Sequence, residues 1–352
     1  MSKPGNPILV EVIRGELAES RHAGAIAVAD PQGRLVMALG DVERPIYPRS
    51  AVKALQAMPL VESGAADAFR LSAEELAVAC ASHSGDSIHV EAVRSLLGKA
   101  GLDESYLACG AHWPVSEAAT AELVRARKRP QAIHNNCSGK HAGMLATAVH
   151  LGLSPRGYER PDHPVQRAIA QTLSEMCGAE VDQARMGIDG CSVPTFALPL
   201  AAFARGFARL GSREGLSVSR ADAARRLIDA CFAAPVLVAG EERFDTIVLR
   251  GLAPSAFVKG GAEGVHCASL PELGLGIAVK IDDGTKRGDE HALAEVLAAL
   301  LPKARKVLAD QLRGELRNWR GRKVGRIAAG AALEEALATL ATPRHRAERA
   351  AR

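Results

Sequence analysis

Apolar and polar residues alternate at the start of the chain. Residues 7–14 (PILVEVIR) follow a period of two, which predicts a half-buried β-strand. Residues 23–41 hold two β-rich runs on either side of an Asp-Pro-Gln-Gly turn, which predicts a hairpin. We therefore expect the chain to open with antiparallel strands.

Helical patterns dominate the middle of the chain. Ser72 with Glu75 forms a candidate capping box, and Ser116 precedes a second helical segment. Pro164 suits the first turn of another helix, whose end is followed by Gly178. After about residue 245, apolar runs of strand length return as TIVLRGL, SAFVKG, GVHCASL and LGIAVKI, before a long Ala/Leu helix from about residue 289.

These patterns predict an α/β (α+β) fold, in which an antiparallel sheet built from both chain ends packs against a largely helical middle. No repeat or low-complexity linker divides the chain. We expect one unit over residues 1–329, with sheet-forming ends 1–49 and 245–329 around a helical middle 50–244. The remaining residues, 330–352, are expected to form a helical extension that frays.

Composition and charge exclude several classes of function. The chain has 352 residues, of which 47% are hydrophobic and 24% charged, as in ordinary globular proteins. The net charge is only +4 with both signs interspersed, so we expect no nucleic acid partner. The longest stretches without charged residues are 15 residues, too short for a membrane span. Glu11 and Arg14 interrupt the N-terminal segment before an apolar stretch of signal-peptide length, so we expect a cytoplasmic protein.

Seven cysteines are scattered along the chain, an odd number that argues against a disulfide framework. Most are expected to be small buried apolar residues. Cys137 and Cys191 differ, since each lies in a glycine-containing loop beside other polar residues.

Ser50 and Lys53 lie one turn apart where an apolar helix is expected to begin, in YPRSAVKALQ. A serine hydroxyl needs a neighbouring base to act as a nucleophile, and a partly desolvated lysine can serve as that base. By itself the spacing is a weak signal and favours a helix cap followed by a surface lysine.

Two further segments carry candidate chemistry. ASHSGD places Ser82 between two expected helices, where hydroxyls and backbone N–H groups can meet a ligand. VKGGAEG places Lys259 at the end of a β-run before two glycines, which allow close approach by a substrate. An ordinary inter-helix turn and an edge-strand lysine are the alternatives.

The segments NNCSGKHAG and GIDGCSVPTF concentrate polar residues. The first is not a phosphate-binding loop, because Asn135 stands where that motif needs glycine and His141 replaces its Ser or Thr. Cys137 and Cys191 could supply thiolates to one Zn²⁺, although neither belongs to a C-x-x-C pair. Plain loops remain the alternative for both.

Taken in order, YPRSAVKALQ, ASHSGD, NNCSGKHAG, GIDGCSVPTF, VKGGAEGV and KIDDGTKR resemble the asparaginase II family, the class 3 or rhizobial-type L-asparaginases. The resemblance runs from about residue 7 to residue 328. It implies a fold similar to serine β-lactamases and glutaminases, and hydrolysis of L-asparagine to L-aspartate and ammonia in a cytoplasmic homodimer.

The resemblance also implies roles for particular residues. Two Ser-Lys tandems fall on Ser50 with Lys53 and on Ser82 with Lys259. A zinc site maps onto Cys137, Lys140 and Cys191, where Zn²⁺ would assist rather than perform the chemistry. Family positions around the substrate fall on Arg49, His141 and Asp189. From their chemistry, Arg49 suits the α-carboxylate and Asp189 the α-ammonium group, and His141 suits orientation of the substrate or the metal ligands.

Two other readings compete. One is an S-x-x-K acyl transferase or β-lactamase, since Ser50, Ser82 and Lys259 echo the order of its elements. That reading fits poorly, because position 83 is His where those enzymes have Asp and position 84 is not Asn. The other is a non-catalytic protein on the same scaffold that binds a metal or an amino acid. Ammonia release from asparagine separates it from an enzyme.

Overall fold

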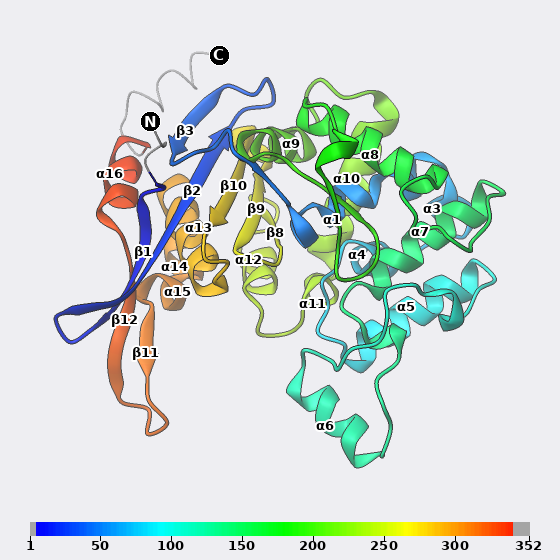
Figure 1. The fold of residues 1–352 in the computed structure, drawn as a ribbon, viewed down its shortest axis with the longest axis horizontal. Coiled ribbons are helices and arrows are strands. Elements are labelled where there is room, and N and C mark those ends of the chain that lie inside the picture. The colour runs from blue at the N-terminus through cyan, green and yellow to red at the C-terminus, as the bar shows by residue number, and fades with distance from the viewer. Residues whose placement is uncertain (1–4, 341–352) are drawn as a thin grey trace.

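Strands from both ends of the chain form one antiparallel sheet (Figure 1). The computed structural model describes residues 5–340. Eight strands pair in the order β11-β12-β1-β2-β10-β9-β8, with β3 joined to β2. Their bounds are β1 (Ile8–Arg14), β2 (Leu17–Ala29), β3 (Leu35–Leu39), β8 (Phe257–Gly260), β9 (Val265–Leu270), β10 (Leu275–Ile281), β11 (Glu315–Arg317) and β12 (Lys323–Ala329). This arrangement confirms the predicted fold class.

The predicted opening hairpin is also confirmed, since β2 pairs with β3 across the turn at Asp30. The N-terminal strand β1 lies between β2 and the late strand β12, with Val12 opposite Ser20 on one side and Ile327 on the other. Strand β10 continues the sheet on the far side of β2, with Ala27 opposite Ala278. Segments about 250 and about 315 residues apart along the chain therefore hydrogen-bond to one another.

The two faces of the sheet carry side chains of different size. Along β2, Ala25, Ala27 and Ala29 face helix α9 (Leu200–Ser212), whereas Ile26 and Val28 face α13 (Lys286–Leu300) and its neighbours. This alternation follows from the period of two in a strand. A Cβ at Gly276 of β10 would lie 1.9 Å from the carbonyl oxygen of Ala204, so the small residues allow α9 to pack almost against the backbone of the sheet.

Short and medium helices fill the middle of the chain and pack beside the free edge strand β8 (Figure 1). Their bounds are α1 (Lys53–Gln56), α2 (Met58–Glu62), α3 (Ala65–Ala68), α4 (Ala73–Ala79), α5 (Ser87–Lys99), α6 (Glu117–Arg125), α7 (Ser138–His150), α8 (Pro164–Cys177), α10 (Val218–Ala233), α11 (Pro235–Val238) and α12 (Phe244–Leu252). Three-residue or four-residue 3₁₀ turns lie at η1 (Arg49–Val52), η2 (Glu104–Tyr106), η3 (Ala132–His134), η4 (Gln183–Arg185) and η5 (Pro271–Leu273). Short ladders pair β4 (Pro45–Ile46) with β7 (Leu198–Pro199) and β5 (Met186–Ile188) with β6 (Pro194–Phe196).

Several predicted helix boundaries are confirmed. Ser72 accepts a hydrogen bond from the Glu75 N–H while the Glu75 carboxylate accepts one from the Ser72 N–H, the reciprocal pair expected for a capping box. Pro164 opens α8, and Gly178 ends it in a left-handed conformation. All seven cysteines are buried and free, as the absence of a disulfide framework requires.

The segment TIVLRGL is helical, so its prediction as a strand was wrong. It forms most of α12, whose buried residues Asp245, Val248, Leu249 and Leu252 follow helical spacing. A short apolar run rich in β-branched residues fits either structure, and here packing against β8 and α14 (Ala304–Val307) decides for the helix.

The chain after the last strand continues into α16 (Ala331–Leu340), which packs on β1, β3 and α13. Leu333 is fully buried in the core between the sheet and α13. The part of the expected extension after residue 340 lies outside the described residues. Between α14 and β11 the chain forms α15 (Ala309–Arg313). Within residues 5–340, no helix combines the length and apolar character that a membrane span requires.

Candidate active site

Ser50 lies in the 3₁₀ turn that precedes α1, beside the turn after β8. A Cβ at Gly261 would lie 2.8 Å from the Pro48 carbonyl oxygen and 3.1 Å from the Ala51 nitrogen, so glycine allows the β8 turn to touch the backbone on both sides of Ser50. Arg49 has φ of 52°, a left-handed conformation that costs a non-glycine residue about 1–3 kcal/mol. The surrounding structure therefore holds the backbone at Arg49, directly before Ser50, in a left-handed conformation.

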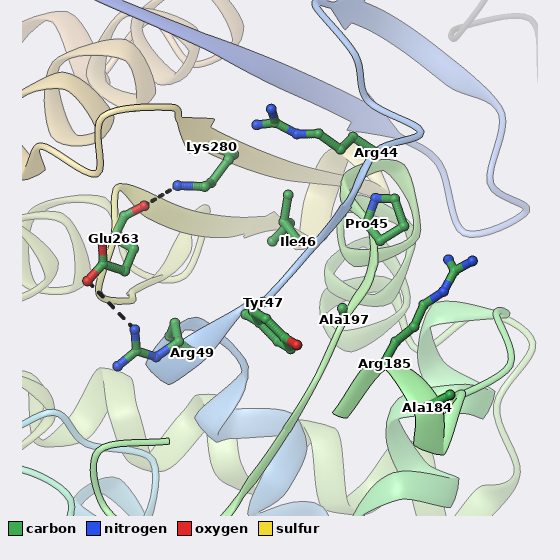
Figure 2. Close-up of a pocket in the computed structure, with 10 residues that line it drawn as sticks. All are labelled: Arg44, Pro45, Ile46, Tyr47, Arg49, Ala184, Arg185, Ala197, Glu263 and Lys280. Carbon is green, nitrogen blue, oxygen red and sulfur yellow. Dashed lines mark hydrogen bonds and ion pairs between the residues drawn. The ribbon is translucent and has the colours of Figure 1, made fainter. Parts of the chain in front are cut away.

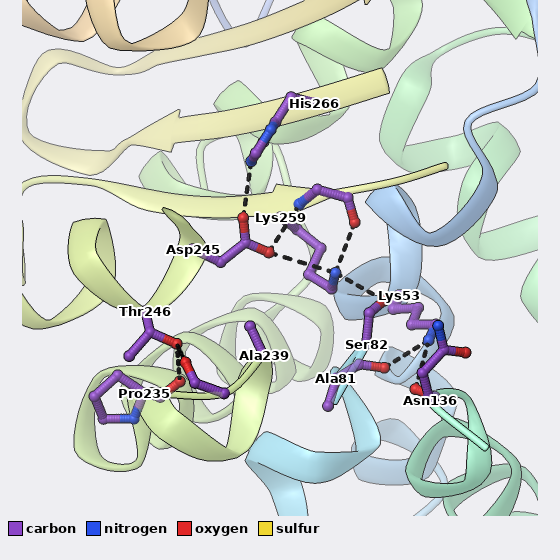
Figure 3. A network of polar contacts seen from close by, with 12 residues as sticks. Lys53, Ala81, Ser82, Asn136, Pro235, Ala239, Asp245, Thr246, Lys259 and His266 are labelled. Carbon is purple, nitrogen blue, oxygen red and sulfur yellow. Dashed lines mark hydrogen bonds and ion pairs between the residues drawn. The ribbon is translucent and has the colours of Figure 1, made fainter. Parts of the chain in front are cut away.

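Lys53 follows Ser50 by three residues and is fully buried. Its Nζ donates to the carbonyl oxygens of Ala81, at 2.6 Å, and Asn136, at 3.2 Å (Figure 3). In the described part of the chain, no hydrogen bond joins Lys53 to Ser50. Lys53 thus connects the Ser50 turn to the loops that carry Ser82 and Cys137.

Ser82 and Lys259 meet although 177 positions separate them. Lys259 is fully buried on β8, and its Nζ donates to Ser82 Oγ at 3.0 Å and to the Gly260 carbonyl oxygen at 2.7 Å (Figure 3). Burial lowers the pKa of Lys259 to about 8, although the Asp245 carboxylate opposes the shift. Lys259 can therefore lose its proton close to neutral pH, as a base acting on Ser82 requires.

The loop around Ser82 is held from two sides. The Ser82 N–H donates to the Val238 carbonyl oxygen at 2.9 Å, and the His83 N–H to that of Asn136 at 3.2 Å. The buried His83 ring also lies 2.9 Å from Ser138 Oγ, at the start of α7. These contacts fix Ser82 relative to the loop that precedes α7.

Cys137, Lys140 and Cys191 converge in a buried cluster. Lys140 Nζ donates to Cys191 Sγ at 3.0 Å, and the two thiols share a hydrogen bond. The hydrogen bond from Cys191 lowers the pKa of the Cys137 thiol well below its usual value. Burial opposes a charged Lys140, but the sulfur atoms raise its pKa.

This cluster is a chemical fit for Zn²⁺, which binds cysteine sulfur and nitrogen donors. The fit depends on the lysine amine, because residues 5–340 contain no group of three or more His, Cys, Asp or Glu side chains placed to hold a metal ion. If Zn²⁺ binds here, Cys137, Cys191 and Lys140 would be the residues that hold it.

Arg49 and Asp189 bind one another directly. Arg49 Nε lies 3.0 Å and Nη2 2.8 Å from Asp189 Oδ1, which also accepts the Gly190 N–H at 2.7 Å. Burial would raise the pKa of Asp189, but Lys140 and Arg49 lower it. A fixed cation next to a fixed anion complements the two charges of an α-amino acid.

His141 is fully buried beside this pair of loops. Tyr158 Oη accepts the Ala108 N–H at 2.9 Å and lies 2.5 Å from His141 Nδ1. We therefore assign a hydrogen bond in which the tyrosine hydroxyl donates to Nδ1, which leaves the ring proton of His141 on Nε2. Burial and Lys140 lower the pKa of His141 well below its usual value, which keeps the ring neutral. Its protonated Nε2 has no partner among residues 5–340 and remains able to donate.

A cavity of about 620 Å³ opens next to Arg49 (Figure 2). Its wall includes Tyr47 and Glu263, whose carboxylate lies 3.8 Å from Arg49. Three further cations, Arg44, Arg185 and Lys280, give the cavity a positive balance. The four serines and lysines of the tandems do not line it, so Arg49 is the residue that the cavity shares with the site.

Sequence reasoning missed the buried residues behind Lys259. Asp245 Oδ2 lies 3.6 Å from Lys259 Nζ, and His266 Nε2 lies 2.9 Å from Asp245 Oδ1. Neither Asp245 nor His266 belongs to a recognisable sequence motif. The available signal was their polarity within otherwise apolar segments, TIVLRGL with its preceding Asp and GVHCASL.

Comparison with solved structures gives partial overlaps. A protein described as Mglu in its native form is 16% identical, with 87% of this chain and 68% of that chain covered and a TM-score of 0.45. A β-lactamase from Mycobacterium bovis is 15% identical, with 82% and 94% covered and a TM-score of 0.36. Simvastatin synthase from Aspergillus terreus is 13% identical, with 82% and 92% covered and a TM-score of 0.39.

A search of curated protein sequences gives no match. The family model for L-asparaginase II, in contrast, matches residues 10–329. The match spans every site residue described above, from Arg44 to Lys280, and confirms the resemblance found in the sequence. The chain belongs to the L-asparaginase II family and is a hydrolase.

Proposed function

We propose that this protein is an L-asparaginase that hydrolyses L-asparagine to L-aspartate and ammonia through two Ser-Lys tandems. The buried contact of 3.0 Å between Lys259 Nζ and Ser82 Oγ is the observation that supports this proposal most. A lysine whose pKa is near 8 and a serine at hydrogen-bond distance are the components of base-assisted acyl transfer.

In the proposed reaction, Ser50 Oγ attacks the side-chain amide carbon of asparagine. Its proton passes to Lys53 and then to the amide nitrogen, which leaves as ammonia while an ester forms on Ser50. A neutral Lys53 amine would have two hydrogens for the Ala81 and Asn136 carbonyls and a lone pair for the serine proton. Water then cleaves the ester, aspartate leaves and Ser50 recovers a proton.

Ser82 and Lys259 would act in the second step, where they would take a proton from the water that attacks the ester and return it to Ser50 Oγ as aspartate leaves. Arg49 would hold the α-carboxylate of the substrate and Asp189 its α-ammonium group. His141 Nε2 would donate a hydrogen bond toward the substrate or the loop that carries Asp189. In this scheme substrate binding replaces part of the direct contact between Arg49 and Asp189.

Zn²⁺, when bound by Cys137, Lys140 and Cys191, would supply a fixed cross-link between the loops on which these residues lie. Cys191 follows Asp189 by two residues, so its thiol can fix the loop that recognises the substrate. The tandems already provide nucleophile and base, and the metal is therefore assigned to orientation.

A panel of amide substrates with ammonia detection tests the proposed function. We expect asparagine to be favoured over glutamine by one to several orders of magnitude in kcat/KM. If Arg49 and Asp189 fix the amino-acid end, the extra methylene of glutamine displaces the amide carbon by roughly 1.5 Å, and about 1 Å of misplacement can cost on the order of 10²-fold in rate. Similar kcat/KM for both amides would indicate a glutaminase-like amidohydrolase, and no ammonia from either would favour the non-catalytic reading.

Elemental analysis tests the metal site. We expect Cys137→Ser and Cys191→Ser to reduce the zinc content toward zero and to raise KM more than they lower kcat, because the ligands orient the substrate loop. Cys177→Ser is the matched control, since Cys177 is equally buried in α8 and should leave the zinc content unchanged. One equivalent of zinc in both ligand variants would contradict the assignment.

A further inference from the structure

Three buried ionisable residues lie behind Lys259, on the side away from Ser82. Asp245 belongs to α12, His266 to β9 and Asp289 to α13. Their exposed fractions are 6%, 1% and 1%, although residues of these types are seldom buried without a partner. The sequence motifs and the proposed reaction use none of the three.

The three residues and Lys259 form a chain in which the sign of the charge alternates. Asp245 Oδ2 lies 3.6 Å from Lys259 Nζ, and Asp245 Oδ1 lies 2.9 Å from His266 Nε2. His266 Nδ1 lies in turn 3.6 Å from Asp289 Oδ1. Figure 3 shows the first two of these contacts. The chain leads from the serine into the core between the sheet and α13.

The backbone of β8 next to Lys259 leaves room for the side chains of Asp245 and His266. The Gly260 N–H donates to Asp245 Oδ2 at 3.0 Å. A Cβ at Gly260 would lie 3.2 Å from His266 Cε1 and 3.4 Å from Asp245 Oδ1. A glycine at this position therefore lets both side chains reach the backbone next to Lys259. The Phe244 ring meets the His266 ring edge-on, at 5.2 Å between centroids, and covers it from α12.

His266 balances the charge of Asp245. Burial opposes protonation of His266, but Asp245 and Asp289 together raise its pKa to about 9. Asp245 is thus paired with a cation at neutral pH and does not by itself force Lys259 to keep its proton. An unpaired buried carboxylate at this distance would stabilise the ammonium form strongly.

We propose that Asp245 and His266, backed by Asp289, are positioning residues that hold Lys259 on Ser82 while leaving its proton free to move. This inference rests on the proposed role of Lys259 as a base and extends it to residues that do not touch the substrate. Asp245 anchors the amine by charge and by its hydrogen bond to Gly260. His266 offsets the Asp245 charge, and Asp289 offsets that of His266.

The test measures the pH dependence of kcat/KM for asparagine in amide variants. Charged or titratable groups act on Lys259 from several other segments, namely Lys53, Cys137, Arg243 and Asp245. Asp245→Asn removes the anion next to Lys259, so the acidic limb of the profile should move to lower pH. His266→Gln keeps a donor for Asp245 but removes the cation, so the limb should move to higher pH. Each shift of the acidic limb is expected to be roughly one pH unit, the size that a charge a few ångströms away produces in a pKa.

Opposite shifts are the expected result, and the loss of activity in His266→Gln at pH 7 should appear in kcat rather than in KM. A residue that only supports the fold would lower activity at every pH and leave the limb in place. His291→Gln is the matched control. Like His266, His291 is a buried histidine, but it belongs to α13 and lies against Gln311 and Glu295. Its limb should coincide with that of the unmodified protein.

The outcomes separate this inference from the proposed function. No ammonia release from asparagine by the unmodified protein would overturn the proposed function itself. An active Lys259→Ala variant would instead remove Lys259 from the reaction, and the proposed role of the Ser82–Lys259 tandem would fail. An inactive Lys259→Ala variant combined with unshifted limbs in Asp245→Asn and His266→Gln would overturn the positioning role alone. If either of these two variants does not fold, as judged by thermal unfolding, Asp289→Asn acts through the same chain and should shift the limb in the direction of His266→Gln. An unshifted limb there would contradict the proposal.

Discussion

Replacing Ser50 by alanine is expected to lower kcat for asparagine hydrolysis by on the order of 10³-fold or more while leaving the fold intact. The substitution removes one oxygen from a half-buried side chain that has no hydrogen bond within residues 5–340, so little packing is lost. The measurement is steady-state ammonia release, with thermal unfolding as the check on the fold.

Ser174→Ala provides the matched control for this variant. Ser174 is a half-buried serine on α8, away from the site, and its truncation should leave kcat unchanged. Substantial activity in Ser50→Ala together with its loss in Ser82→Ala would transfer the nucleophile role to Ser82, which is the serine that contacts a lysine directly.

Replacing either tandem lysine by arginine should be nearly as damaging as replacing it by alanine, on the order of 10²–10⁴-fold in kcat. A guanidinium keeps the positive charge but cannot release its proton under these conditions. Lys53 and Lys259 are both fully buried, so neither arginine could turn to solvent. The comparison of Lys→Arg with Lys→Ala at each position isolates proton transfer from charge.

Lys99→Arg is the control for this comparison, because Lys99 is an exposed lysine that pairs with Glu75 and donates to the Arg70 carbonyl oxygen. Its variant should keep full activity. Arg variants at positions 53 and 259 that retained most of the activity would mean that these lysines act as electrostatic anchors, and the scheme of proton transfer would be wrong.

Local features of the fold could be predicted because they depend on neighbouring residues. The period of two in residues 7–14, the turn at Asp30, the capping box at Ser72 and the stop at Gly178 each act within a few positions of the chain. The segment TIVLRGL could not be assigned, since its type is set by contacts with β8 and α14 rather than by its own pattern.

The candidate site shows the same division. Residues that stand in compact motifs, such as Cys137 with Lys140, could be singled out from the sequence. The resemblance joined Ser82 to Lys259, but their spacing alone did not. Asp245 and His266 could not be found, because their relation is made by a helix and a strand that meet only in the folded chain. The partners of Lys53 are backbone carbonyls, which carry no signal in a sequence.

The pairing of β1 with β12 and of β2 with β10 bears on synthesis of the protein. The β1–β2–β3 segment leaves the ribosome well before its partners, because β10 follows β2 by about 250 residues and β12 follows β1 by about 315. At about 5–20 residues per second, these two strands stay without those partners for roughly 10–60 seconds. Unpaired strand edges promote association between chains. We therefore expect the yield of folded protein from a cell to depend on how well the nascent N-terminal strands are shielded, and to rise when chaperones that bind nascent chains are supplied.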